Sequence, residues 1–71
     1  MVELTPVRSS NIAAVGYDSS TTTLYIQFRN GRLYAYAGVP LEIYYALMAA
    51  SSKGRYFYYR IRLRFRATRV R

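Results

Sequence analysis

The chain has 71 residues, nine tyrosines, three phenylalanines, no histidine, no cysteine and a formal net charge of +8. This length allows one small domain, and without cysteine neither a disulfide nor a thiolate-bound metal can stabilise it. The run MVELTPVRSS lacks a basic stretch before a long apolar one, and no apolar stretch reaches the roughly 20 residues that span a bilayer, so we expect a cytoplasmic protein without signal peptide or membrane span.

Residues 5–37 are typical of β structure. Thr5–Arg8 favours a short edge strand, where Pro6 is tolerated because an edge residue need not donate its N–H. Ile12–Tyr17 is predicted as a second strand, weakened by its small residues. The run DSST then supplies turn chemistry, since Asp18 and Ser19 can hydrogen-bond their own backbone.

A hairpin is predicted around Asn30–Gly31. Thr22–Arg29 alternates apolar and polar residues, as a half-buried strand does, and Arg32–Ala37 is the returning strand. Asn-Gly favours a two-residue type I′ turn, because both of its central positions need positive φ. A two-residue turn places Ile26 opposite Ala35.

This register predicts two different faces for the hairpin. The first face is apolar and suits a covering helix; it carries Leu24, Ile26, Phe28, Leu33, Ala35 and Ala37. The second is an aromatic strip with two arginines at its turn end; it carries Tyr25, Gln27, Arg29, Arg32, Tyr34 and Tyr36. Exposed tyrosines on a sheet can stack on unpaired bases. The strip is therefore a candidate nucleic-acid platform, and ordinary cross-strand packing is the alternative role of its tyrosines.

A helix is predicted over about residues 40–50. Pro40 suits the first helical position, and Glu42 places a negative charge at the positive end of the helix dipole. An apolar stripe at helical spacing predicts the buried face; it carries Leu41, Tyr44, Tyr45 and Met48, widened by Ile43 and Leu47.

The basic C-terminal segment has two interpretations. Strict alternation favours a strand over Phe57–Phe65. A helix is also supported, because Ser51 or Ser52 can cap its N-terminus and Phe57, Ile61 and Phe65 recur at i, i+4 and i+8. We favour a second short helix over about 52–62, with residues 63–71 as an extended or frayed basic tail. The expected fold is a single α+β domain over residues 1–71, with an antiparallel sheet of three to four strands followed by two helices.

Three runs, VRSSNIAAVGYD, LYIQFRNGRLYAYAGVP and ASSKGRYFYYRIR, resemble in this order the KTSC domain, a small bacterial module. Its tyrosine–any–tyrosine motif matches Tyr34-Ala35-Tyr36, and Val39-Pro40 follows. The resemblance covers roughly residues 7–63. The family is named for its occurrence at the C-terminus of some lysyl-tRNA synthetases, so the resemblance implies RNA as a ligand. Family members often carry asparagine where this chain has Tyr58.

The positive charge is confined to the end of the chain. Arg8, Arg29 and Arg32 balance three acids within residues 1–52, whereas residues 53–71 hold eight basic residues and no acid. Such asymmetry favours an anionic partner, RNA or another single-stranded nucleic acid first. The candidate nucleic-acid-binding residues are Tyr25, Arg29, Arg32, Tyr34, Tyr36, Lys53, Arg55, Arg60, Arg62, Arg64 and Arg66. A protein partner or a homodimer is the alternative, and contact with an anionic membrane is a weaker one.

Catalysis is not expected. The chain has no histidine or cysteine, and its carboxylates, Glu3, Asp18 and Glu42, lie far apart in the sequence. General acid–base chemistry needs a titratable group held close to its reacting proton, and metal sites need clustered ligands. We therefore predict neither a catalytic residue nor a metal ligand nor a cofactor.

Overall fold

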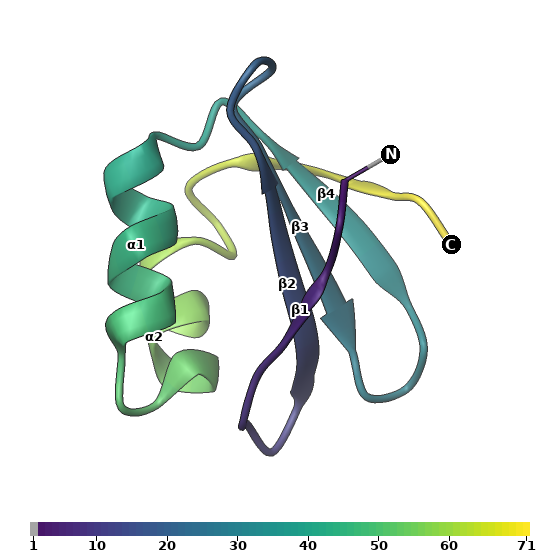
Figure 1. The fold of residues 1–71 in the computed structure, drawn as a ribbon, viewed down its shortest axis with the longest axis vertical. Coiled ribbons are helices and arrows are strands. Elements are labelled where there is room, and N and C mark those ends of the chain that lie inside the picture. Colours follow the sequence, from purple (N-terminus) through teal and green to yellow (C-terminus); the bar gives the residue numbers. More distant parts are fainter. Residues whose placement is uncertain (1) are drawn as a thin grey trace.

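Five antiparallel strands and two helices make up the fold in the computed structural model, which describes residues 2–71 (Figure 1). In chain order the elements are β1 (Thr5–Pro6), β2 (Ile12–Asp18), β3 (Thr23–Phe28), β4 (Leu33–Ala37), α1 (Leu41–Ala49), α2 (Lys53–Arg60) and β5 (Arg66–Arg69). The strands lie in the order β1-β2-β3-β4-β5, and both helices cover the same face of the sheet. The predicted α+β class is confirmed.

The sheet has one strand more than the three to four expected. Residues 66–69, assigned to the basic tail, form β5, which pairs antiparallel with β4. The Val70 N–H also donates to the Leu33 carbonyl oxygen at 2.7 Å. Without β5, the backbone N–H and carbonyl groups of β4 that point away from β3 would have no partner in the sheet. Within the predicted tail of residues 63–71, Arg66–Arg69 is therefore a strand.

The β3–β4 hairpin contains Asn30 and Gly31 as predicted, but its loop has three residues instead of two. The Phe28 N–H donates to the Arg32 carbonyl at 2.9 Å, and the Gly31 N–H donates to the Phe28 carbonyl at 2.9 Å. Gly31 has a φ of +92°, which suits the glycine that ends a three-residue hairpin loop with a bulge.

The extra loop residue shifts the register by one, so the predicted pairing is wrong. Ile26 lies opposite Tyr34 rather than Ala35, and Leu24 lies opposite Tyr36. Because side chains alternate along a strand, the shift exchanges the two faces of β4. Tyr34 and Tyr36 therefore share the helix-covered face of the sheet with Leu24 and Ile26.

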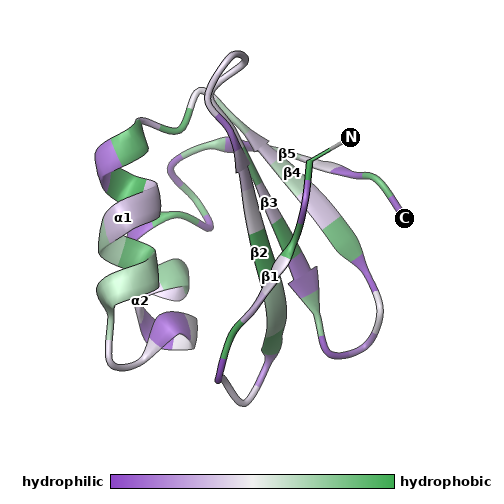
Figure 2. Ribbon diagram, viewed as in Figure 1, coloured by the Kyte–Doolittle hydropathy of each residue, from purple (hydrophilic) through white to green (hydrophobic). Residues whose placement is uncertain are grey.

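A bulge in β2 lets two residues at an odd spacing enter the core. Ile12 pairs with Phe28 and Ala14 with Gln27, so Ala13 is an extra residue on this strand. Simple alternation would place Ile12 and Val15 on opposite faces, yet both are fully buried. Figure 2 shows the hydrophobic residues of β2 and the hydrophilic ones in the turns and at the start of α2.

The core lies between the sheet and the two helices. It consists of Ile12, Val15, Leu24, Ile26, Tyr36, Val39, Leu47, Phe57 and Ile61. Leu47 of α1 is fully buried in this core. The Tyr44 ring of the same helix stacks on the Tyr17 ring, with ring centroids 5.1 Å apart. The Tyr17 hydroxyl donates to the Val39 carbonyl at 2.6 Å and fastens the start of this helix to β2. Leu41 and Tyr45, predicted in the buried stripe, are exposed.

Both predicted helices are confirmed, with small changes at their ends. Pro40 precedes the first turn of α1 instead of forming its first residue. Ser52 caps α2, since its hydroxyl oxygen accepts from the Arg55 N–H at 3.3 Å. The alternative strand over Phe57–Phe65 is wrong: Phe57 and Ile61 are buried, but Leu63 is 82% exposed, which strict alternation does not allow.

Candidate nucleic-acid interface

The three tyrosines of the predicted platform do not lie together. Tyr36 is a core residue with 4% exposure, and its ring meets Phe57 edge to face at 5.5 Å. Tyr34 is half-buried beside it, with ring centroids 6.5 Å apart. Tyr25 pairs with Ala35 and so points to the other face of the sheet. The one-residue register shift has thus divided the strip, and the buried Tyr36 ring is not available to a base.

Burial has a measurable consequence at Tyr36. Burial away from solvent raises the pKa of Tyr36 to about 12. The neighbouring Tyr34 adds to this increase, and Arg62 opposes it. An unfolded tyrosine titrates near 10, so between these pH values the folded chain holds its phenolic proton and the unfolded chain does not. Stability therefore falls as pH rises through that window, by up to about 3 kcal/mol.

We expect Tyr36→Phe to remove this part of the alkaline loss of stability. Urea unfolding at a series of pH values, for the wild type and the variant, measures it. Equal slopes above pH 10 in the two proteins would show that Tyr36 is not the residue responsible.

The two arginines at the hairpin loop have different surroundings. The Arg29 Nε donates to the Ser9 carbonyl at 2.7 Å, and its backbone N–H donates to the Asn11 carbonyl at 2.9 Å. Arg29 therefore ties the loop of residues 9–11 to the hairpin. Arg32 is exposed, and within residues 2–71 its hydrogen bonds come from its backbone: its N–H donates to the Asn30 Oδ1 at 2.9 Å, and its carbonyl accepts from the Phe28 N–H at 2.9 Å.

The basic C-terminal segment forms two surfaces rather than one. Lys53, Arg55 and Arg60 belong to α2, in the helical layer, whereas Arg66 and Arg69 belong to β5 at the edge of the sheet (Figure 1). The guanidinium groups face solvent as predicted, because every arginine from residue 55 onward is exposed. Lys53 is half-buried, and its Nζ donates to the Ala50 carbonyl at 3.0 Å.

α2 also presents two exposed aromatic rings that the sequence prediction missed. Tyr58 and Tyr59 are 54% and 66% exposed, and their rings meet edge to face at 5.1 Å. The Arg62 guanidinium lies over the Tyr58 ring, 4.4 Å from its centroid, which is cation–π geometry. The signal was present in the sequence: once Phe57 and Ile61 define the buried face of the helix, residues 58 and 59 lie outside that face.

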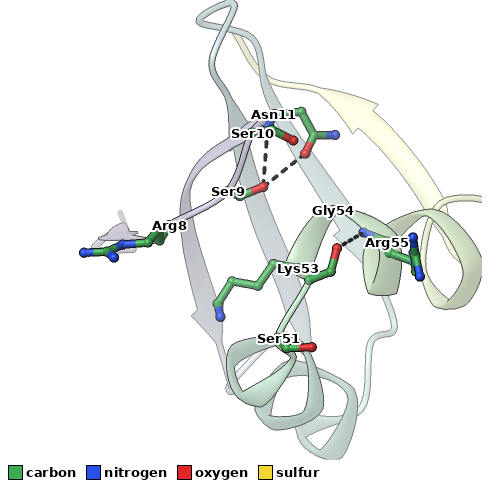
Figure 3. Close-up of a pocket in the computed structure, with 9 residues that line it drawn as sticks. Arg8, Ser9, Ser10, Asn11, Ser51, Lys53, Gly54 and Arg55 are labelled. Atoms are coloured by element: carbon green, nitrogen blue, oxygen red, sulfur yellow. Dashed lines mark hydrogen bonds between the residues drawn. The ribbon is translucent and has the colours of Figure 1, made fainter.

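Two neighbouring hollows flank the start of α2, and both are lined by cationic residues without acids. The first, of about 420 Å³, lies between the segment Arg8–Asn11 and residues 51–55. Figure 3 shows Ser9 and Asn11 on one side of it, and Ser51 and Lys53 on the other. The second hollow, of about 360 Å³, is lined by Ala50, Ser51, Ser52, Arg55, Tyr56, Tyr59 and Arg60. Arg55 borders both.

Gly54 permits the close approach that forms the first hollow. A Cβ atom at this position would lie 2.5 Å from the Asn11 Oδ1, which already accepts from the Ser9 hydroxyl at 3.1 Å. Such a distance is too short for a carbon and an oxygen, so Asn11 would have to move. Glycine therefore sets the width of the gap between α2 and the loop.

We expect the effect of Gly54→Ala to depend on Asn11. Replacing glycine with alanine at a helical position stabilises a protein by about 0.4–1 kcal/mol when no strain opposes it. That gain should appear in the Asn11→Ala background and be reduced or reversed in the wild-type background. A double-mutant cycle in urea measures the coupling, and the same change in both backgrounds would contradict the tight contact.

Two features are absent from residues 2–71, a cluster of metal-ligand side chains and a membrane-spanning helix. No group of three or more His, Cys, Asp or Glu side chains comes together there as metal ligands would. No helix in that range is long and apolar enough to cross a membrane.

The structure thus defines a class of protein: a small α+β domain with a five-stranded antiparallel sheet, two helices on one face and a strongly basic C-terminal segment. The family model of the KTSC domain matches residues 8–65, so the chain belongs to the KTSC domain family. A crystal structure of a KTSC domain protein from Yersinia pestis superposes with a TM-score of 0.96 at 38% identity, covering 100% of both chains.

Relatives in other bacteria are similar in sequence. A protein of Tsukamurella paurometabola is 44% identical over 62 residues, which are 87% of this chain and 92% of that protein. An uncharacterized protein of Stutzerimonas stutzeri is 41% identical over 51 residues, 72% of each chain. The lysine–tRNA ligase of a Nostoc species is 40% identical over 57 residues, which are 80% of this chain but 10% of that longer protein.

Proposed function

We propose that this domain is a non-catalytic cytoplasmic module that binds single-stranded RNA through the exposed surface of α2. The observation that carries the proposal is the meeting of exposed aromatic rings and exposed arginines on α2 and the turn that follows it. Tyr58 and Tyr59 lie among Arg55, Arg60 and Arg62, all exposed. We call this set the α2 surface.

The charge on the α2 surface suits a phosphate backbone. No acid occurs between residues 53 and 71, so the arginines there have no carboxylate in their own segment. A protein that places such cations on phosphates gains affinity by releasing counterions. The hollow shared by Arg55 and Arg60 lies beside Tyr59, which puts a place for a phosphate next to an exposed ring.

The aromatic rings suit unpaired bases. In complexes with single-stranded nucleic acids, bases stack on exposed aromatic side chains and on arginine planes. Tyr58 already has a guanidinium over one face of its ring, and Tyr58 and Tyr59 are each more than half exposed as residues. A duplex does not offer its base faces, so this chemistry favours a single strand.

A relative supports RNA over other polyanions. The similar segment of the Nostoc protein belongs to a lysine–tRNA ligase, whose name states that its substrate is a tRNA. A domain carried by such an enzyme is exposed to RNA whenever the enzyme works. We extend this context to the present chain as part of the proposal.

The test is a titration of the intact protein with a fluorescent oligouridylate. We expect binding at about 50 mM salt that weakens steeply as salt rises. Backbone amide shifts should be concentrated in residues 53–62. No binding at that salt, or shifts confined to the sheet, would overturn the proposal.

The two tyrosines offer a separate measurement of stacking. We expect Tyr58→Ala and Tyr59→Ala each to weaken oligouridylate binding, by about 1–3 kcal/mol for a ring that stacks on a base. The matched variants Tyr58→Phe and Tyr59→Phe keep the ring and should keep most of the affinity. If the alanine and phenylalanine variants bind alike, the rings do not contact bases.

A further inference from the structure

The two edges of the sheet differ in their capacity to pair with another chain. β1 forms one edge with two residues, one of them Pro6, which has no N–H. β5 forms the other edge with four residues, all exposed. An unpaired edge strand is a template for a further strand, and of the two edges only β5 has the length for it.

The outward backbone groups of β5 follow from its pairing with β4. The Val70 N–H donates to Leu33, and hydrogen-bonded pairs alternate along an antiparallel ladder. The groups of Arg66 and Thr68 therefore turn toward β4, and those of Ala67 and Arg69 turn away from it. These two outward residues have N–H and carbonyl groups available to an added strand.

The side chains of β5 place positive charge on both faces of the sheet. Arg69 lies opposite Tyr34, on the helix-covered face, and Arg66 lies opposite Ala37, on the other face. Arg71 follows at the mouth of an apolar hollow of about 280 Å³, which Val2, Leu4, Tyr25, Leu33 and Val70 also line. A strand added to this edge would meet arginines above and below its plane.

The arginines on β5 indicate which kind of chain can pair with this edge of the sheet. A second copy of the chain pairing through its own β5 would bring the two sets of arginines together, and like charges in facing positions destabilise a strand pair. An extended segment with alternating acidic residues would instead form cross-strand pairs of opposite charge. Its apolar residues would reach Val70, which is 50% exposed on the same face as the hollow.

We propose that the outer edge of β5 is a docking strand for an extended acidic segment of a partner protein, which adds to the sheet as a sixth strand. The interaction uses main-chain hydrogen bonds at Ala67 and Arg69 for affinity, and Arg66, Arg69 and Arg71 for selectivity. It is independent of RNA binding at the α2 surface, since it uses another part of the molecule.

The probe is a fluorescent peptide of about seven residues in which Glu alternates with Val, the length of an ordinary strand. We expect it to bind the intact protein with amide shifts in residues 66–71. A peptide of the same sequence with alternate amides N-methylated keeps the charge but loses main-chain donors, and should bind about tenfold more weakly or worse.

Three variants complete the test. Ala67→Pro removes an outward N–H without touching the pairing with β4, and should weaken binding about tenfold. Arg66→Gln with Arg69→Gln should also weaken it, whereas the triple variant Arg55→Gln, Arg60→Gln and Arg62→Gln should not. Equal binding of the N-methylated and plain peptides would reduce the interaction to charge alone and overturn the proposal. It is equally overturned if the peptide does not bind, or if sedimentation shows a dimer that Ala67→Pro abolishes.

Discussion

Phe57→Ala is expected to remove about 3–5 kcal/mol of stability, which is most of what a domain of this size has. Phe57 is 5% exposed and anchors α2 to the sheet. Its ring makes edge-to-face contacts with Phe28 at 5.4 Å and with Tyr36 at 5.5 Å, and each such pair adds about 0.5–1.5 kcal/mol to the burial of the ring. Urea unfolding followed by circular dichroism measures the loss.

Tyr59→Ala is the matched control, because it removes an aromatic ring from the same helix at a position that is 66% exposed. We expect this variant to change stability by less than about 0.5 kcal/mol. A similar loss in the two variants would mean that α2 is not held to the sheet through Phe57. The control also establishes that a Tyr59 variant used in RNA titrations is folded.

The triple replacement Arg55→Gln, Arg60→Gln and Arg62→Gln is expected to weaken oligouridylate binding at low salt by about 100-fold or more. A hydrogen bond to a charged group contributes about 1.5–3 kcal/mol, so the loss of two such contacts suffices. If all three arginines meet phosphates, the slope of log affinity against log salt should become shallower by about 2, since each contact on a single strand contributes about 0.7.

The chain provides a control of equal charge. Replacing Arg66, Arg69 and Arg71 with glutamine removes the same number of charges from the β5 edge and its end. We expect this second triple variant to retain most of the RNA affinity. Equal losses in the two variants would mean that net charge, and not the α2 surface, accounts for binding. Circular dichroism of both proteins checks that they are folded.

The sequence pattern predicted the elements better than it predicted the register of the strands. Helical spacing identified Phe57 and Ile61 as buried, and the hydrogen-bonding capacity of serine identified Ser51 or Ser52 as the N-cap, of which the structure uses Ser52. The hairpin loop was placed correctly, but Asn30–Gly31 fits a two-residue loop and a three-residue loop alike, because each needs a glycine with positive φ. Local sequence does not decide between them.

Packing decided the register, and the candidate site changed with it. In the strand LYAYA both alternating sets are apolar or aromatic, so either face can be buried. The structure buries Tyr36 against Phe57 and leaves Leu33 and Ala35 to the other face. The predicted aromatic platform was therefore wrong, because its three tyrosines do not lie on one face of the sheet. The arginines of α2 were predicted as exposed from the cost of burying an unpaired guanidinium, and that prediction is confirmed.

The position of β5 in the chain has a consequence for biosynthesis. The strand pairs with β4, but both helices and their connections separate the two in the sequence. A ribosome delivers residues in order, so β4, which ends at Ala37, is made before β5, which begins at Arg66. Until β5 is made, the outward backbone groups of β4, at Leu33, Ala35 and Ala37, have no partner in the sheet. The arginine-rich strand Arg66–Arg69 then pairs with β4 and completes the sheet.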